Sequence, residues 1–133
     1  MPIISRWLIN RSNLLIHDYI PPFTVEDLVE SQKFSLGLME QADHPIISIV
    51  DMSKVYTIPD RLLTRFPELA RHRVLGHPNN ALTIVVMTNR IVERFTEIFH
   101  RVYFRVELVH SMEEAMAAAQ AHPDFVDDLA YLR

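Results

Sequence analysis

The chain has 133 residues, the size of one ordinary domain, and 49% of them are hydrophobic, as is usual for a globular core. It has no cysteine, which excludes disulfides, thiolate metal sites and a cysteine nucleophile. The formal net charge of −4 argues against nucleic acid as a partner, and two glycines are too few for the usual phosphate-binding loops.

The first 20 residues predict a β-hairpin. The apolar runs IISRWLI and LLIHDYI flank the polar turn cluster NRSN, so we expect a strand, a turn and a strand from about Ile3 to Ile20. Pro21 and Pro22 should end the second strand, because proline cannot donate to the hydrogen-bond ladder.

A helix is expected from about residue 24 to residue 42. Thr24 with Asp27 three residues later is similar to a capping box, with Asp in place of the preferred Glu. An incomplete apolar stripe follows at helical spacing, and Gly37 weakens it locally. The stripe consists of Val25, Leu28, Val29, Leu36 and Met39.

Three later apolar runs predict parallel strands near residues 46–51, 82–87 and 106–110. The first two are nearly continuous, which is typical of strands covered on both faces. The third is more polar and is expected nearer an edge of the sheet.

Helical patterns separate and follow these strands. Residues 57–76 begin with the cap spacing of Thr57 and Asp60, and Pro67 should kink or split this helix. The pattern of residues 89–104 predicts an amphipathic helix more clearly than any other stretch. Residues 111–122 begin with Ser111 and Glu114, which have capping-box spacing.

The predicted order is therefore β-β-α-β-α-β-α-β-α. Alternating strands and helices indicate an α/β fold with a mostly parallel central sheet and right-handed crossovers. No linker or internal repeat is visible, so residues 1–133 are expected to form a single domain.

The stretch IISIVDMSKVYTIPDRLL, residues 46–63, resembles the signature of STAS domains, the family of anti-sigma-factor antagonists and sulphate-transporter C-terminal domains. The matching positions are Val50, Asp51, Met52, Ser53 and Val55, with Lys54 where glycine is common. The order of elements is also similar, over roughly residues 3–122. The resemblance implies a STAS-like fold and a non-catalytic regulatory or protein-interaction role.

The chain departs from that family at its phosphorylated serine. The matching turn reads Ile58-Pro59-Asp60-Arg61-Leu62 and contains no hydroxyl group. Asp60 is either a plain helix cap or a fixed negative charge, which a helix N-terminus favours by about 0.3–1 kcal/mol. A serine-kinase switch at this turn is therefore not expected.

The first hypothesis is a protein partner bound by the loop and the following helix. Residues 61–105 carry eight arginines against Glu68, Glu93 and Glu97, a net charge of +5. These arginines are either a solvated surface or a basic face for an acidic partner. A homodimer is left open. The expected partner-binding residues are Ser53, Lys54, Tyr56, Thr57, Asp60, Arg61 and Arg65.

The alternative is a small-molecule or lipid site at the carboxyl ends of the strands, where open α/β sheets place ligands. Its expected residues are Asp51, Ser53, Thr88, Asn89 and His110. A hydrolase is least favoured, because Ser53 has no nucleophile motif around it, and Ser53 and Thr57 are expected to bond local backbone.

No metal or cofactor is expected, since none of the seven histidines has metal-ligand spacing. No apolar run approaches the roughly 18 to 20 residues needed to span a bilayer. The N-terminus lacks the pattern of a secretory signal, so a cytoplasmic location is expected.

Overall fold

The computed structural model describes residues 3–7, 13–55, 78–88, 90 and 106–126. They form, in chain order, β1 (Ile3–Trp7), β2 (Leu14–Tyr19), α1 (Val25–Gln41), β3 (Ile46–Asp51), β4 (Asn80–Val86), β5 (Val106–Val109) and α4 (Met112–Ala121). The α/β class is thereby confirmed. The helices expected over 57–76 and 89–104 lie outside the described residues, apart from position 90.

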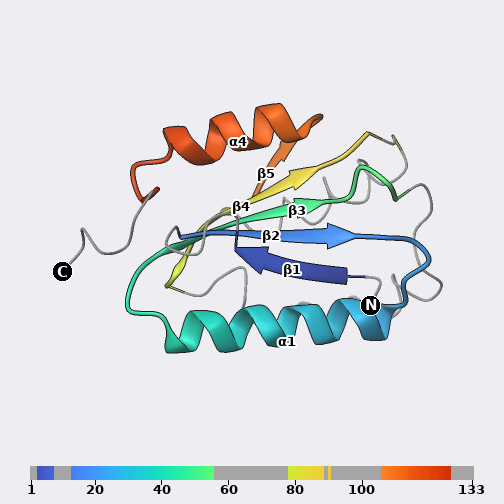
Figure 1. Cartoon of the computed structure of the whole chain (residues 1–133), viewed down its shortest axis with the longest axis horizontal. Helices are drawn as coiled ribbons and strands as arrows, with labels where there is room; N and C mark the ends of the chain where they lie inside the picture. The colour runs from blue at the N-terminus through green and yellow to red at the C-terminus, as the bar shows by residue number, and fades with distance from the viewer. Residues whose placement is uncertain (1–2, 8–12, 56–77, 89, 91–105, 127–133) are drawn as a thin grey trace.

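The sheet has five strands, and its order β1-β2-β3-β4-β5 follows the chain. β1 pairs antiparallel with β2, whereas β2, β3, β4 and β5 pair in parallel. Figure 1 shows the sheet between α1 on one side and α4 on the other. The expected hairpin at one edge and the more polar strand at the other edge are both confirmed.

Both ends of α1 are satisfied by side chains. The Thr24 hydroxyl accepts from the Asp27 N–H at 3.1 Å, and the Asp27 carboxylate accepts from the Thr24 N–H at 2.8 Å, which confirms the capping box. At the other end, Asn79 Nδ2 donates to the carbonyls of Met39 and Ala42 at 2.8 and 2.9 Å. A distant residue thus satisfies acceptors that a helix end leaves open.

At the start of α4, the structure differs in one detail from the predicted capping box of Ser111 and Glu114. The Ser111 hydroxyl accepts from the Glu114 N–H at 3.1 Å, as expected for the N-cap. The Glu114 carboxylate, however, accepts from the His110 N–H at 3.1 Å instead of returning to Ser111. His110 directly follows the last residue of β5, so the acid satisfies the backbone where the strand ladder stops.

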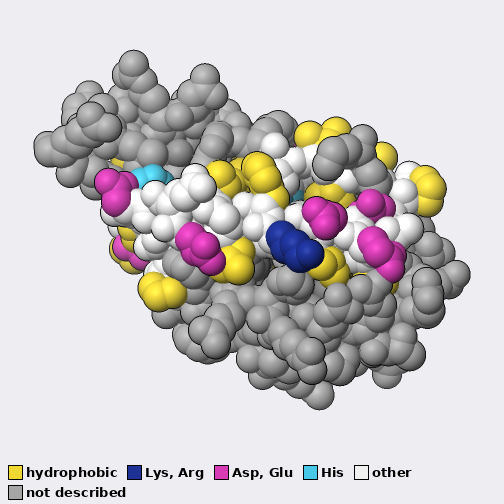
Figure 2. Space-filling model, turned by 90° about the horizontal axis from the view of Figure 1, so that it is seen from below, with side chains coloured by type: hydrophobic (Ala, Val, Ile, Leu, Met, Phe, Trp, Pro, Cys, Tyr) yellow, Lys and Arg dark blue, Asp and Glu magenta, His cyan; other side chains and the backbone are white. Residues whose placement is uncertain are grey.

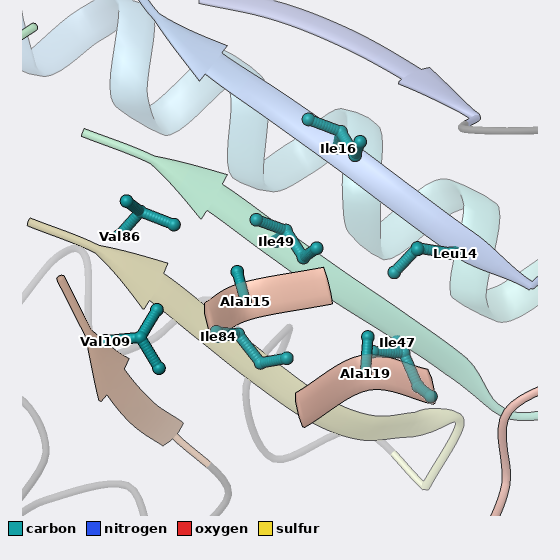
Figure 3. Packing of buried hydrophobic residues seen from close by; sticks show 9 residues of the cluster. All are labelled: Leu14, Ile16, Ile47, Ile49, Ile84, Val86, Val109, Ala115 and Ala119. Carbon is teal, nitrogen blue, oxygen red and sulfur yellow. The ribbon is translucent and has the colours of Figure 1, made fainter. Parts of the chain in front are cut away.

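The larger core lies between the sheet and α4. Side chains alternate along each strand, and one set from β2 to β5 points towards α4, as Figure 3 shows. The helix contributes Ala115 and Ala119, one turn apart and both 0% exposed, so its backbone approaches the sheet closely. The strand residues in this cluster are Leu14, Ile16, Ile47, Ile49, Ile84, Val86 and Val109.

The opposite face of the sheet packs against α1. Leu15 and Ile46 pack with Met39 of the helix, and a second cluster includes Tyr19, Phe23 and other residues nearer the carboxyl ends of the strands. The rings of Tyr19 and Phe23 meet edge to face, with centroids 5.3 Å apart. β3 is therefore covered on both faces, as its continuous apolar run predicts.

A buried histidine joins three elements on the α1 side. The His17 ring in β2 is hydrogen-bonded through Nδ1 to the Ser5 hydroxyl of β1 at 2.6 Å, and through Nε2 to the Ser35 hydroxyl of α1 at 3.2 Å. Burial lowers the pKa of His17 to about 4, so the ring is neutral at pH 7. A neutral ring donates from one nitrogen and accepts at the other, and both capacities are used.

The burial of Asn13 differs from the prediction of a polar turn at residues 10–13. The sequence places it in the turn NRSN, but its side chain is 0% exposed. Its amide reaches the Pro45 carbonyl at 3.0 Å and the Asp124 carbonyl at 2.7 Å, while its side-chain oxygen accepts from the Val126 N–H at 2.8 Å. These hydrogen bonds offset the cost of burying the Asn13 side chain.

No helix in the described part of the chain is long and apolar enough to cross a membrane.

Candidate functional site

The candidate site lies at the carboxyl edge of the sheet. Parallel strands end on the same side, so β2, β3, β4 and β5 all deliver the residues at their ends to this edge (Figure 1). Asp18 lies near the end of β2 and Asp51 ends β3. Thr88 follows β4 by two residues, and His110 directly follows β5.

Asp18 and Asp51 are neighbours across two strands. They are register partners in the β2–β3 pair, and their positions share a sheet face with Ile16 and Ile49 of the α4-side core. Sequence reasoning singled out Asp51 but not Asp18. Both acids lie at the end of an apolar stretch, in LLIHD and in IISIVD, so the sequence offered the same indication for Asp18 as for Asp51. Only the strand register shows that the two acids align.

The loop from Met52 to Val55, here called the carboxyl-edge loop, is held by its neighbours. The Asp51 carboxylate accepts from the Ser53 N–H at 3.0 Å, which forms a tight turn. The Met52 N–H donates to the Val86 carbonyl of β4 at 2.9 Å. Val55 closes the loop by donating to the Met52 carbonyl at 3.0 Å, and its side chain is 1% exposed.

The next two strand ends also hold this edge. The Thr88 hydroxyl donates to the Ser53 carbonyl at 3.1 Å. His110 Nδ1 donates to the Met87 carbonyl at 3.3 Å, and the Met87 N–H donates to the Val109 carbonyl at 3.0 Å. The loop is therefore attached to β4 directly, and β4 is attached beyond its last ladder residue to the end of β5.

The Ser53 hydroxyl was expected to bond local backbone, and no hydrogen bond to it is found among the described residues, which reach Val55 in this segment. The Asp51 carboxylate and the Thr88 hydroxyl bind the Ser53 backbone instead, from before the turn and from the next strand. The Ser53 side chain is partly exposed and Lys54 is exposed, so the loop presents both to solvent.

Of the residues expected for a ligand site, Asp51, Ser53, Thr88 and His110 are brought to this edge, and Asn89 lies outside the described residues. Of those expected for partner binding, Ser53 and Lys54 are described on the loop. The remaining positions lie outside the described residues: Tyr56, Thr57, Asp60, Arg61 and Arg65.

The described residues contain no group of three or more His, Cys, Asp and Glu side chains that could hold a metal ion. The groups that the edge does offer are two acidic residues aligned across β2 and β3, the Ser53 hydroxyl on a fixed backbone and the Lys54 side chain. Comparison of the chain with protein-family models, characterised proteins and solved structures gave no match.

Proposed function

We propose that the chain is a STAS-like regulatory module without catalytic activity, which binds a protein partner through the carboxyl-edge loop and the residues that follow it. The observation that carries the proposal is the way the loop is built. Its backbone is bound by Asp51, by Val86 of β4 and by Thr88, while Lys54 at its tip remains exposed. A preorganised, exposed loop loses little conformational freedom when it binds a partner.

The strand order supports a protein partner over a small ligand. Open α/β sheets bind ligands at the point where the strand order reverses. From β2 to β5 the described order runs in one direction without reversal. In addition, an oxygen of Asp51 and the hydroxyl of Thr88 already bind backbone, so part of the polar capacity expected for a ligand stabilises the loop.

A small-molecule site at the same edge is the second candidate. The alignment of Asp18 with Asp51 favours it, because the strand register brings two acidic residues to neighbouring strand ends, where they could attract a polyol or a cationic group. The two candidates differ in whether a small molecule should remain bound to the protein during purification. Native mass spectrometry of protein from its own host should show the unliganded mass if the first is right and a stoichiometric small ligand if the second is right.

The test of the first candidate is a photo-cross-linking residue placed at Lys54 in the native host, with the same residue at Glu113 of α4 as the control. Both positions are exposed, but they lie on different elements. We expect one partner to be cross-linked from position 54 and not from position 113.

The affinity of that partner should then fall for Lys54→Glu, Asp60→Ser and Arg65→Glu, but not for Glu113→Lys. Charges at the rim of an interface mainly change the association rate and its salt dependence. Unchanged affinity in the Lys54, Asp60 and Arg65 variants would show that this surface is not the interface.

A further inference from the structure

The outer face of α1 is a second surface with unusual composition. It is separate from the carboxyl-edge loop and is not part of the function proposed above. Figure 2 views the molecule from the α1 side and shows acidic side chains around a basic one, with apolar side chains among them. We define the outer face by six exposed residues of α1 and one half-buried glycine among them: Glu26, Glu30, Lys33, Phe34, Glu40 and Gln41, with Gly37.

Phe34 is the most exposed large apolar side chain in the described part of the chain. It is 51% exposed, although the other apolar residues of α1 are buried or half-buried. Leu38, one turn later, packs partly against the Leu15 and Met39 cluster. About half of the Phe34 side chain therefore stays in contact with water, on a helix whose other apolar side chains are buried or half-buried, and that exposed half gains nothing from folding alone.

Gly37 is the second unusual residue on this face. A Cβ added there would meet nothing within 4 Å, so no neighbour in the fold requires a glycine. Glycine in a helix interior is unfavourable relative to alanine. Its one clear use here is to leave the helix backbone open next to Phe34, three residues before it, so that another chain could approach closely.

The charge of the outer face is its third unusual feature. Glu26, Glu30 and Glu40 are exposed, and Asp43 follows the helix, whereas the helix has one basic residue, Lys33. Lys33 lies 3.9 Å from Glu30, and both side chains are largely exposed. No basic residue occupies the last turn, where Glu40 faces the negative end of the helix dipole.

We propose that the outer face of α1 is a docking surface for a basic amphipathic helix of a protein partner. Phe34, Gly37 and Glu40 are spaced three residues apart and are each unfavourable for the isolated domain. A partner helix that crosses at Gly37 covers the Phe34 ring and places lysines or arginines beside Glu30 and Glu40. The same acidic charge disfavours anionic membranes and nucleic acid at this face.

The test uses the full chain and a synthetic amphipathic helical peptide with a leucine stripe flanked by lysines and arginines. A peptide of the same pattern with glutamates in place of the basic residues is the control. Amide chemical shifts should change over residues 26–43 with the basic peptide only, and the affinity should fall as salt is added.

Variants of the face then locate the contact. Phe34→Ala should weaken binding about tenfold, as truncation of an aromatic anchor does. Gly37→Gln should also weaken it, by covering the backbone without adding charge, and Glu40→Lys should slow association. Glu113→Lys on α4, an equal charge change at another exposed position, should leave binding unchanged.

Three results would overturn the proposal. The first is the absence of shift changes over α1 with the basic peptide, and the second is equal binding of the acidic control peptide. The third is self-association of the protein alone that Phe34→Ala abolishes, since the face would then belong to a second copy of this chain. Failure of the loop proposal would leave all of these readouts unaffected.

Discussion

Asn13 donates a hydrogen bond from its side-chain amide to the backbone carbonyl of Asp124 at 2.7 Å, although 111 residues separate the two. The same side chain also binds Pro45 and Val126, and the Asn13 carbonyl accepts from the Ile47 N–H at 2.9 Å. One buried residue thus joins the start of β2, the approach to β3 and the segment that follows α4. The amino end of the sheet depends on this junction.

Asn13→Ala should therefore lower the free energy of unfolding by about 3 kcal/mol, because three partly buried backbone groups lose their hydrogen-bond partner. Chemical denaturation measures the change, and Gln120→Ala, at an exposed position of α4, is the control. The Val126 amide should also exchange faster with solvent in the variant. A wild-type unfolding midpoint in Asn13→Ala would mean that the junction contributes nothing.

Two buried serines should respond in opposite directions to the same substitution. Ser48 and Ser35 are 4% and 5% exposed, but the Ser35 hydroxyl bonds His17, whereas the Ser48 hydroxyl has no partner in the described structure. Ser48→Ala should be neutral or stabilising by up to about 1 kcal/mol, and Ser35→Ala should destabilise by about 1–2 kcal/mol. Equal losses in thermal or denaturant unfolding would contradict this difference.

Stability should fall in mild acid because of His17. Its pKa is lowered by burial to about 4, below the value of 6.5 for an exposed histidine. The unfolded chain therefore binds a proton at a pH where the folded chain does not. The contribution is fully present above pH 6.5, is lost as the pH falls towards 4, and amounts to at most about 3 kcal/mol.

Denaturant titrations between pH 7.5 and pH 4 would measure this loss. His17→Leu should be less stable at pH 7, since Ser5 and Ser35 lose their partner, but its stability should depend less on pH. Gln120→Ala, at an exposed position without a titratable group, should keep the wild-type slope. The same slope in His17→Leu as in the wild type would assign the acid sensitivity to other groups.

Gly37→Ala should stabilise the protein by about 0.5–1 kcal/mol. The added methyl group meets nothing within 4 Å, and alanine has less freedom to lose from the unfolded chain. Ala117→Gly, at an exposed position of α4, is the reverse substitution and should destabilise the protein by a similar amount. Destabilisation by Gly37→Ala would mean that the backbone at this position needs glycine for the fold itself.

The sequence by itself was sufficient for the local structure. The β1–β2 hairpin, the caps at Thr24 and Ser111, the central position of β3 and the edge position of β5 all follow from patterns within about 20 residues. The reason is that caps, turns and apolar periodicity act between near neighbours in the chain. The position of Asp51, Thr88 and His110 at one edge of the sheet also follows, since parallel strands end on the same side.

Tertiary structure alone decided what each polar residue does. Asn13 looked like a turn residue and is buried, His17 looked like one of seven scattered histidines and joins β1 to α1, and Asp18 aligns with Asp51 only through the strand register. The partners in these contacts are 12 to 113 residues apart. Local periodicity carries no information about such distances, so the hydrogen bonds become visible only when packing brings the segments together.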